Sequence, residues 1–193
     1  MPRTKMRRPD ELHRRGGLAM VAAVVALIVA SCTLPPPAHA LDVDNPPKPV
    51  VGGLVTSNGW SQIQTFTAGR TGVLDQVNLF VQFTGPGDLQ VAIHDVNGAY
   101  DLGVLLGSGT HNGSATGEVA VPLSIAPHIV AGHRYAIALR GTVPASQGSW
   151  QLSFSATVPL VGETMYVRYD NPPQDVFPNP SYNISLRTFV RPF

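Results

Sequence analysis

The residues of this chain that could do chemistry are its histidines, its carboxylates and its aromatic side chains. The sequence contains no Gly-x-Ser-x-Gly, His-Glu-x-x-His or P-loop motif. No two histidines after residue 41 stand at i and i+2 on one strand, so their spacing does not predict a zinc site. The carboxylates are scattered, whereas glycoside hydrolysis needs two at a fixed separation. The pattern favours a protein without catalytic residues.

Calcium is the one cofactor that the sequence suggests. Asp95, Asn97 and Asp101 offer hard oxygen ligands around an Asn-Gly turn, and calcium takes about six to eight such oxygens. The segment lacks the spacing of an EF-hand and its closing Glu. Asn-Gly between two apolar strands is also the signal of a β-hairpin. We expect a hairpin here, and a hairpin that binds calcium is the alternative.

Aromatic and polar side chains could bind a ligand without catalysis. Trp60, Tyr100, Tyr166 and Tyr182 fall outside the apolar phase of their strands or in loops, and Arg168 shares the phase of Tyr166. A ligand stacked on an aromatic ring gains on the order of 1 kcal/mol per contact. We expect these residues to be exposed and to contact a ligand. The low charge density of the chain favours a neutral polysaccharide.

Short strands must position these residues. The chain holds 19 Gly and 18 Pro in 193 residues, which opposes long helices. Apolar residues alternate with polar ones in seven segments separated by turn signals, and this period indicates half-buried strands. The segments are 77–83, 89–94, 119–124, 134–140, 150–155, 165–169 and 184–190. The predicted fold class is all-β, an antiparallel sandwich or barrel.

Four fragments carry a resemblance to a known class of module. They are TFTAG at 65–69, GDLQVAIHD at 87–95, AGHRYAIAL at 131–139 and LRTFV at 186–190. In this order and spacing the chain resembles the jelly-roll β-sandwich modules of secreted and surface-anchored bacterial proteins. The resemblance implies a jelly-roll sandwich and carries no agreed function.

The first residues are typical of an export signal. A basic stretch over 1–15 precedes an apolar run at 18–30, which is shorter than the roughly 20 residues of a membrane span. The run ends at VASC (29–32), which resembles a bacterial lipobox and predicts a signal peptide over 1–31 with lipidation of Cys32. The alternative is cleavage after residue 40 at AHA (38–40), which would release a free secreted protein. Both Sec and twin-arginine export fit the leader.

A Pro-rich linker follows at 32–49, and the predicted β-sandwich domain covers 50–193. After residue 40 the chain has 7 Lys and Arg against 10 Asp and Glu, a net charge of −3. This balance argues against nucleic-acid binding. No cysteine remains after residue 40, which excludes disulfides. We expect a monomer that meets the membrane only through its lipid anchor.

Together these patterns predict an exported, lipid-anchored, non-catalytic module of the cell envelope. Its partner would be a polysaccharide or other glycan, or a cell-surface protein. Two alternatives stay open from the sequence: a small secreted hydrolase that acts on a glycan or an ester, and a structural envelope protein with no discrete ligand.

Overall fold

The structure, a computed structural model, describes residues 38–46, 53–84, 87–98, 102–155, 163–170, 173–179 and 182–193. From His39 to Phe193 the chain forms one unit. The predicted signal peptide, Cys32 with its lipobox, Tyr100 and Asp101 all lie outside the described residues. Within the described part of the chain, no helix is both long and apolar enough to span a bilayer.

Strands dominate the described residues, and their ladders are antiparallel. One short 3₁₀ helix, Ala145–Gln147, interrupts them. This confirms the predicted all-β, antiparallel fold class. The strands are β1 Ala40–Asn45, β2 Gly53–Thr56, β3 Trp60–Thr67, β4 Gly72–Thr84, β5 Leu89–Val96, β6 Leu102–His111, β7 Gly117–Ile125, β8 His128–Ile129, β9 Arg134–Gly141, β10 Trp150–Ser155, β11 Met165–Asp170, β12 Pro173–Asn179, β13 Asn183–Ile184 and β14 Leu186–Arg191.

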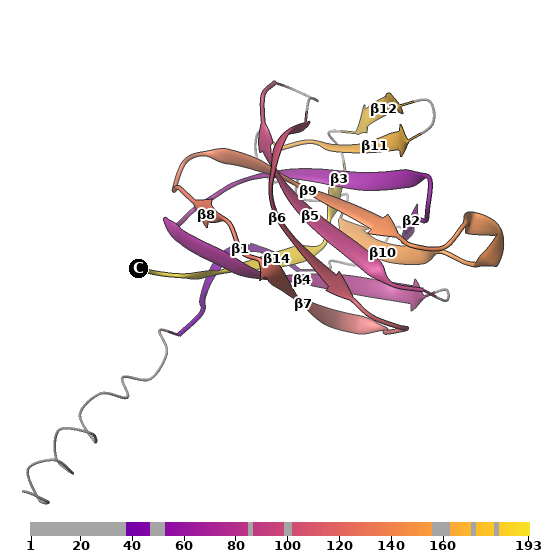
Figure 1. Cartoon of the computed structure of the whole chain (residues 1–193), viewed down its shortest axis with the longest axis horizontal. Helices are drawn as coiled ribbons and strands as arrows, with labels where there is room; N and C mark the ends of the chain where they lie inside the picture. Colours follow the sequence, from indigo (N-terminus) through magenta and orange to yellow (C-terminus); the bar gives the residue numbers. More distant parts are fainter. Residues whose placement is uncertain are drawn as a thin grey trace, which may run out of the picture. The chain divides into compact units, whose positions relative to one another are not determined.

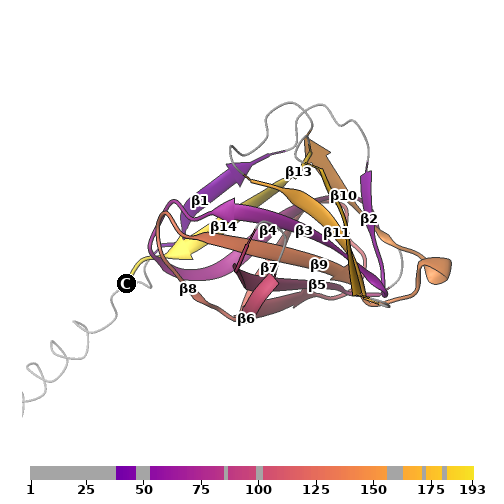
Figure 2. The ribbon, with the colours of Figure 1, turned by 90° about the horizontal axis from the view of Figure 1, so that it is seen from above.

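The strands form one curled sheet in the order β1-β14-β4-β7-β6-β5-β9-β3-β11-β12. We call β1, β14, β4 and β7 the first half, and β6, β5, β9, β3, β11 and β12 the second half. The sheet curls so that β4, β7 and β14 face β3, β5 and β9 across the core (Figures 1 and 2). β10 pairs with β2, β4 and β13 beside this path.

Alternation decides which residues enter the core. In β5 and β9 the odd-numbered residues face inward, among them Leu89, Ile93 and Ile137, which have no exposed surface. They pack in one cluster with residues of the first half, such as Leu79 and Val121. Because successive side chains of a strand point to opposite faces, the even-numbered residues of β5 and β9 lie on the outer face of the second half.

The structured unit begins earlier than the sequence predicted. Residues 40–45 were expected in the Pro-rich linker, but they form β1, which pairs with β14. The backbone N–H of Val43 donates to Thr188 Oγ1 at 3.0 Å, and the buried Asn45 amide donates to the Ile184 carbonyl at 2.8 Å. These bonds are long-range, so the local composition could not indicate them. The compact unit of the structure, which starts at His39, therefore includes β1 as well as the residues of the predicted domain.

Candidate ligand-binding groove

A hollow of about 340 Å³ lies on the outer face of the second half. This volume is near the lower end of the range that is typical of small-molecule pockets. Five strands contribute residues to it. Its lining residues are Ser61 and Ile63 from β3, Gln90, Ala92 and His94 from β5, Leu102 from β6, Ala138 and Arg140 from β9, and Arg168 from β11. We call this hollow the groove.

Small side chains make the floor of the groove. Strand register places Ile63, Ala138 and Ala92 side by side, because Ala138 is the Cα partner of both of the others. An alanine side chain stands only one carbon above the sheet, so two adjacent alanines leave a depression between longer neighbours. The floor is apolar, and Ile63 and Ala138 also belong to a small buried cluster on this face.

A row of polar side chains borders the floor on one side. Arg168 is the Cα partner of Ser61, and Gln90 is the Cα partner of Arg140. Gln62 pairs with Leu139, so Ser61 and Arg140 come next to each other in the same ladder. The row therefore reads Arg168, Ser61, Arg140, Gln90 across four strands. Neighbouring strands lie about 4.8 Å apart, which separates the two arginine Cα atoms by roughly 10 Å.

His94 lines the groove from the other side of the floor. Its Nδ1 lies 3.2 Å from the Gly103 carbonyl oxygen. A carbonyl only accepts, so Nδ1 carries the proton in this bond and Nε2 of the neutral ring is an acceptor. Burial lowers the pKa of His94, the Gly103 bond raises it, and the charge of Arg168 lowers it, with a lowered pKa as the result. The ring is neutral at pH 7 and can accept a hydrogen bond from a ligand hydroxyl.

Ser61 and His94 do not form a nucleophile–base pair. His94 shares a row with Ala136 and Thr65, and Ser61 lies four residues along β3 from Thr65. Two strand spacings and four residues of about 3.3 Å separate their Cα atoms by roughly 16 Å. None of the lining residues that the structure describes is Asp or Glu. The groove can therefore donate and accept hydrogen bonds, and its described lining residues do not include a paired acid and base for hydrolysis.

Tyr166 corrects one expectation from the sequence. It lies on the outer face like Arg168, as its phase predicted, but its side chain is only 2% exposed rather than open to a ligand. It packs with Ile63, Ala136 and Ala138 beneath this face. The sequence of β11 could not indicate this burial, because the side chains that bury Tyr166 come from β3 and β9.

The remaining predicted contact residues are not brought together. Trp60 is half-buried and lies opposite Tyr169, with 5.5 Å between the ring centroids. Tyr182 is half-buried against the core and meets Phe154 edge-on at 4.8 Å. Neither residue lines the groove, and Tyr100 lies outside the described residues. Among the members of the predicted set that the structure describes, Arg168 alone lines the groove.

The hairpin predicted around Asn97 is present, since β5 pairs with β6 in antiparallel register. Asp95 Oδ1 lies 2.9 Å from His133 Nε2 and accepts the Val96 N–H at 3.0 Å. The bond from His133 is the main cause of the lowered pKa of Asp95. Among the described residues, no three His, Cys, Asp or Glu side chains gather as a metal site would require. Asp101 is outside that set, so calcium binding by Asp95, Asn97 and Asp101 stays a prediction.

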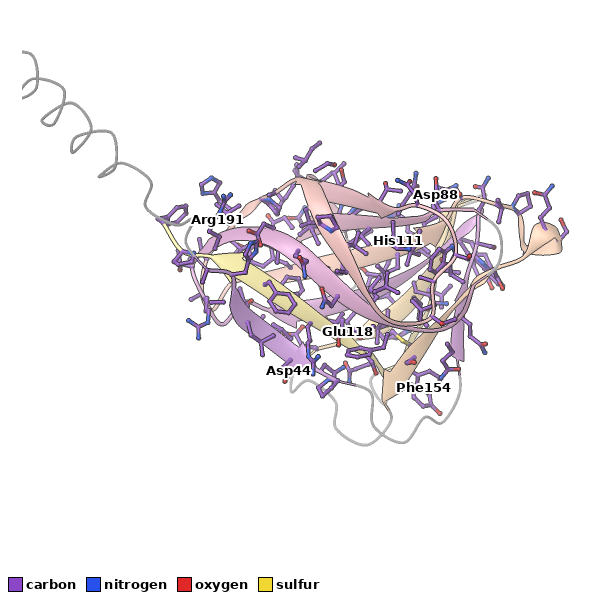
Figure 3. All side chains as sticks on the ribbon, turned by 90° about the horizontal axis from the view of Figure 1, so that it is seen from below. Asp44, Asp88, His111, Glu118, Phe154 and Arg191 are labelled. Carbon is purple, nitrogen blue, oxygen red and sulfur yellow. The ribbon has the colours of Figure 1, made fainter. Side chains whose placement is uncertain are left out.

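The outer face of the first half is arranged differently. Arg187 Nε lies 2.8 Å from Asp44 Oδ1, and its Nη1 lies 3.0 Å from Glu118 Oε2. Figure 3 shows Asp44 and Glu118 near each other on this face. Asn78 also donates to Glu118, and this bond is the largest cause of the lowered pKa of Glu118. The positive charge on this face is matched by carboxylates of the protein itself.

The chain was compared with protein-family models, with curated proteins and with solved structures. No protein-family model and no curated protein matches the chain. Among solved structures, it is similar to the cysteine protease and lectin-like domains of Cwp84, a surface layer associated protein of Clostridium difficile, at 19% identity and a TM-score of 0.48. The match covers 70% of this chain and 33% of that one, so the chain spans about a third of that protein's length.

Proposed function

We propose that this protein is an exported binding module that holds a glycan in the groove without cleaving it. The observation that carries the proposal is the combination of an apolar alanine floor with a polar border on both sides. A sugar ring presents C–H groups on its faces and hydroxyls around its edge. The faces suit Ala92 and Ala138, and the edge suits the donors and acceptors of Gln90, Ser61 and His94.

We also propose that the module is anchored to the membrane through a lipid on Cys32. The lipobox at 29–32 supports this. A second support comes from the competing cleavage site, because cleavage after residue 40 would remove His39. In the structure His39 Nδ1 lies 3.0 Å from Asp75 Oδ1, and Ala40 is already paired with Val190. Cleavage before Cys32 keeps both contacts.

Filling the groove tests the binding function. Ala92→Leu adds bulk to the floor, and Ala120→Leu is its control, because Ala120 is exposed on β7 of the first half. The processed protein and both variants are applied to a glycan array that carries neutral and acidic sugars. We expect the wild type and Ala120→Leu to retain the same glycans and Ala92→Leu to lose them. If Ala92→Leu binds as well as the wild type, the groove is not the binding site.

A fractionation experiment tests the anchor. Lipidation buries acyl chains at about 0.8 kcal/mol per CH₂ and holds a protein in the membrane fraction. Cys32→Ala should move the protein out of that fraction or block its processing. A wild-type protein whose mature N-terminus is Leu41 and which is free in the medium would show that the alternative cleavage site is used.

A further inference from the structure

We propose that one end of the sheet docks onto the lipid bilayer, so that the protein meets the membrane through apolar side chains as well as through a lipid on Cys32. The inference goes beyond glycan binding, and it rests on the proposed anchor. It replaces the expectation that the lipid is the only contact with the membrane. The end in question is the one at which β1 begins, and we call it the tether end.

Strand register defines the tether end. β1 begins and β14 ends there, since Ala40 is the Cα partner of Val190, and β4 begins there beside β8. On the second half, β3 ends beside the start of β9, where Thr67 pairs with Arg134. The hairpin of β5 and β6 turns at the same end. Figures 1 and 2 both show the C-terminus and β8 together there.

Exposed apolar side chains are concentrated at the tether end. Among the residues that the structure describes, seven large apolar side chains are exposed, and six of them lie at this end or in the first residues of a strand that starts there. The six are Leu41, Val104, Leu105, Ile125, Val130 and Phe193. The seventh, Tyr169, lies at the opposite end beside Trp60. Single exposed apolar residues are ordinary on a protein surface, whereas a concentration of them marks an interaction site.

Neighbouring strands bring these side chains into one area, which we call the apolar patch. His128 stacks on Phe193 with 5.1 Å between the ring centroids. Val130 is two residues from His128 and shares its outward phase, because both are exposed and the residue between them is buried. Ile125 pairs with β6, the strand that carries two further members of the set. The patch therefore extends from the end of β14 across β8 and β7 to β6.

The position of the anchor identifies the bilayer as the occupant of the apolar patch. His39 is the first residue of the structured unit, and it is seven residues after Cys32. A chain of that length spans at most about 25 Å. A domain of this size is roughly 40 Å across. Because the link is shorter than the domain, a lipid on Cys32 holds the tether end close to the bilayer.

Ion pairs within the protein balance the charges of the tether end. Asp75 Oδ1 lies 3.0 Å from His39 Nδ1, and Asp75 Oδ2 lies 3.8 Å from Arg191 Nε. Asp95 Oδ1 lies 2.9 Å from His133 Nε2. The described groups of this end therefore lack the excess of Lys and Arg that attracts anionic lipids. Docking should depend on apolar burial, with similar strength on neutral and anionic vesicles and little change with salt.

Docking at this end leaves the polar row of the groove away from the bilayer. Ser61, in the middle of that row, is six residues from Thr67 along β3, which places it roughly 20 Å from the tether end. The groove opens on the outer face of the second half and not at the strand ends. Ala92→Leu, which fills the groove, should therefore leave docking unchanged.

Fluorescence of the processed protein in phosphatidylcholine vesicles tests the inference. Cys32 is the only cysteine of the chain, so a lipidated protein has no free thiol and a maleimide dye reacts only with a cysteine introduced elsewhere. Ala131→Cys places a polarity-sensitive dye in the exposed turn after β8, and Ser114→Cys is the matched control in the exposed turn between β6 and β7 at the opposite end. With a nitroxide-labelled lipid in the vesicles, we expect the dye at residue 131 to emit at shorter wavelength and to be quenched. The dye at residue 114 should show neither effect.

Variants in the Ala131→Cys protein assign the effect to the apolar patch. Phe193→Ser should lower the ratio of docked to free domain about tenfold, because it removes the largest apolar side chain that would enter the bilayer. Val130→Ser should lower the ratio by a smaller factor. Tyr169→Ser changes an exposed apolar residue of the opposite end and should leave the ratio unchanged. Thermal melts verify that each variant is folded.

The outcomes separate this inference from the anchor on which it rests. If the thiol of Cys32 in the wild type reacts with the dye, the anchor is wrong and the inference is wrong with it. If Cys32 is lipidated and the dye at residue 131 keeps the emission of a dye in water, docking is wrong and the anchor stands. A shift to shorter wavelength without quenching by the labelled lipid would show that a second copy of the chain covers the patch, which also contradicts docking. Quenching that is the same in Phe193→Ser and Val130→Ser as in the parent protein contradicts the assignment to the apolar patch.

Discussion

Replacing Tyr166 by alanine should destabilise the protein, and this prediction is independent of any ligand. The Tyr166 side chain is 2% exposed and packs with Ile63, Ala136 and Ala138. Removing a fully buried aromatic ring costs about 3–5 kcal/mol, of which the lost burial is one part and the cavity left behind is another. Because the groove is adjacent and water can enter the space, we expect the lower end, about 3 kcal/mol.

The assay is a thermal or urea melt of the processed protein. For a domain of this size 1 kcal/mol changes the melting temperature by about 2–4 °C, so Tyr166→Ala should melt roughly 6–12 °C below the wild type. Tyr169→Ala is the matched control, since Tyr169 lies on the same strand and is 37% exposed. It should lose about 1 kcal/mol. A Tyr166→Ala protein that melts within about 2 °C of the wild type would refute the burial of this ring. It would also refute the packing of Tyr166 against Ile63, Ala136 and Ala138.

Three further changes probe the frame around the groove. Arg134 Nε lies 3.1 Å from Glu163 Oε2, and the Glu163 side chain is 4% exposed, so Arg134→Ala would leave a buried carboxylate without its cation. The free energy of unfolding should fall by about 3 kcal/mol. An unchanged midpoint in a urea melt would contradict this. Gly107→Ala would place its Cβ 2.4 Å from the Ile125 carbonyl oxygen and should cost about 1–3 kcal/mol, whereas Gly98→Ala meets no atom within 4 Å and should melt like the wild type. The pKa of His94 is lower in the folded protein than in the unfolded chain, so the unfolded chain takes up a proton at His94 more readily. The free energy of unfolding should therefore be unaffected by this residue above about pH 6.5 and should decrease as the pH falls below that value. His94→Asn should make the melting temperature fall less steeply between pH 7 and 5, and identical slopes for the two proteins would contradict the assignment.

Alternation predicted the strands whose two faces differ in polarity. β4, β5, β7, β9, β10 and β11 each contain one of the segments expected from the period of two, and the seventh segment covers β13 and β14. β3 did not show this period, because Gln62 and Gln64 occupy its inward phase and are buried. Gln64 is stabilised there by distant groups: its amide donates to Asn183 Oδ1 at 2.9 Å, and its oxygen accepts the Ile184 N–H at 2.9 Å. Such bonds join residues far apart in the chain and leave no local signal.

Strand β6 was not predicted by alternation, and the reason differs from that for β3. Its sequence holds three glycines within ten residues, which reads as a turn-rich segment. The structure shows what two of these glycines do. A Cβ on Gly107 or Gly109 would come within 2.4 Å of a carbonyl oxygen of the segment containing β7. Glycine is therefore needed where β6 and the neighbouring chain approach closely at the curl of the sheet, and a turn is not its role here.

The groove depends on register, and register is what a single sequence does not contain. The out-of-phase residues of β5 and β9 could be identified from alternation alone, including His94, Ala92, Ala138 and Arg140. Only the pairing of β3 with β9 and of β9 with β5 places Ala138 between Ile63 and Ala92. A shift of one strand by two residues would keep every side chain on its face and would separate the alanines.

The same dependence explains why an overall net charge of −3 after residue 40 did not predict the groove's cationic border. Composition also does not show which arginine meets which carboxylate: Asp44 and Glu118 contact Arg187, and Glu163 contacts Arg134. Arg168 and Arg140 come onto one row only through strands β11, β3 and β9, which are far apart in the chain. A two-residue slip of β11 against β3 would move Arg168 by about 6.6 Å along the sheet and away from Ser61. The polar border of the groove is therefore a property of strand pairing, and composition carries no information about it.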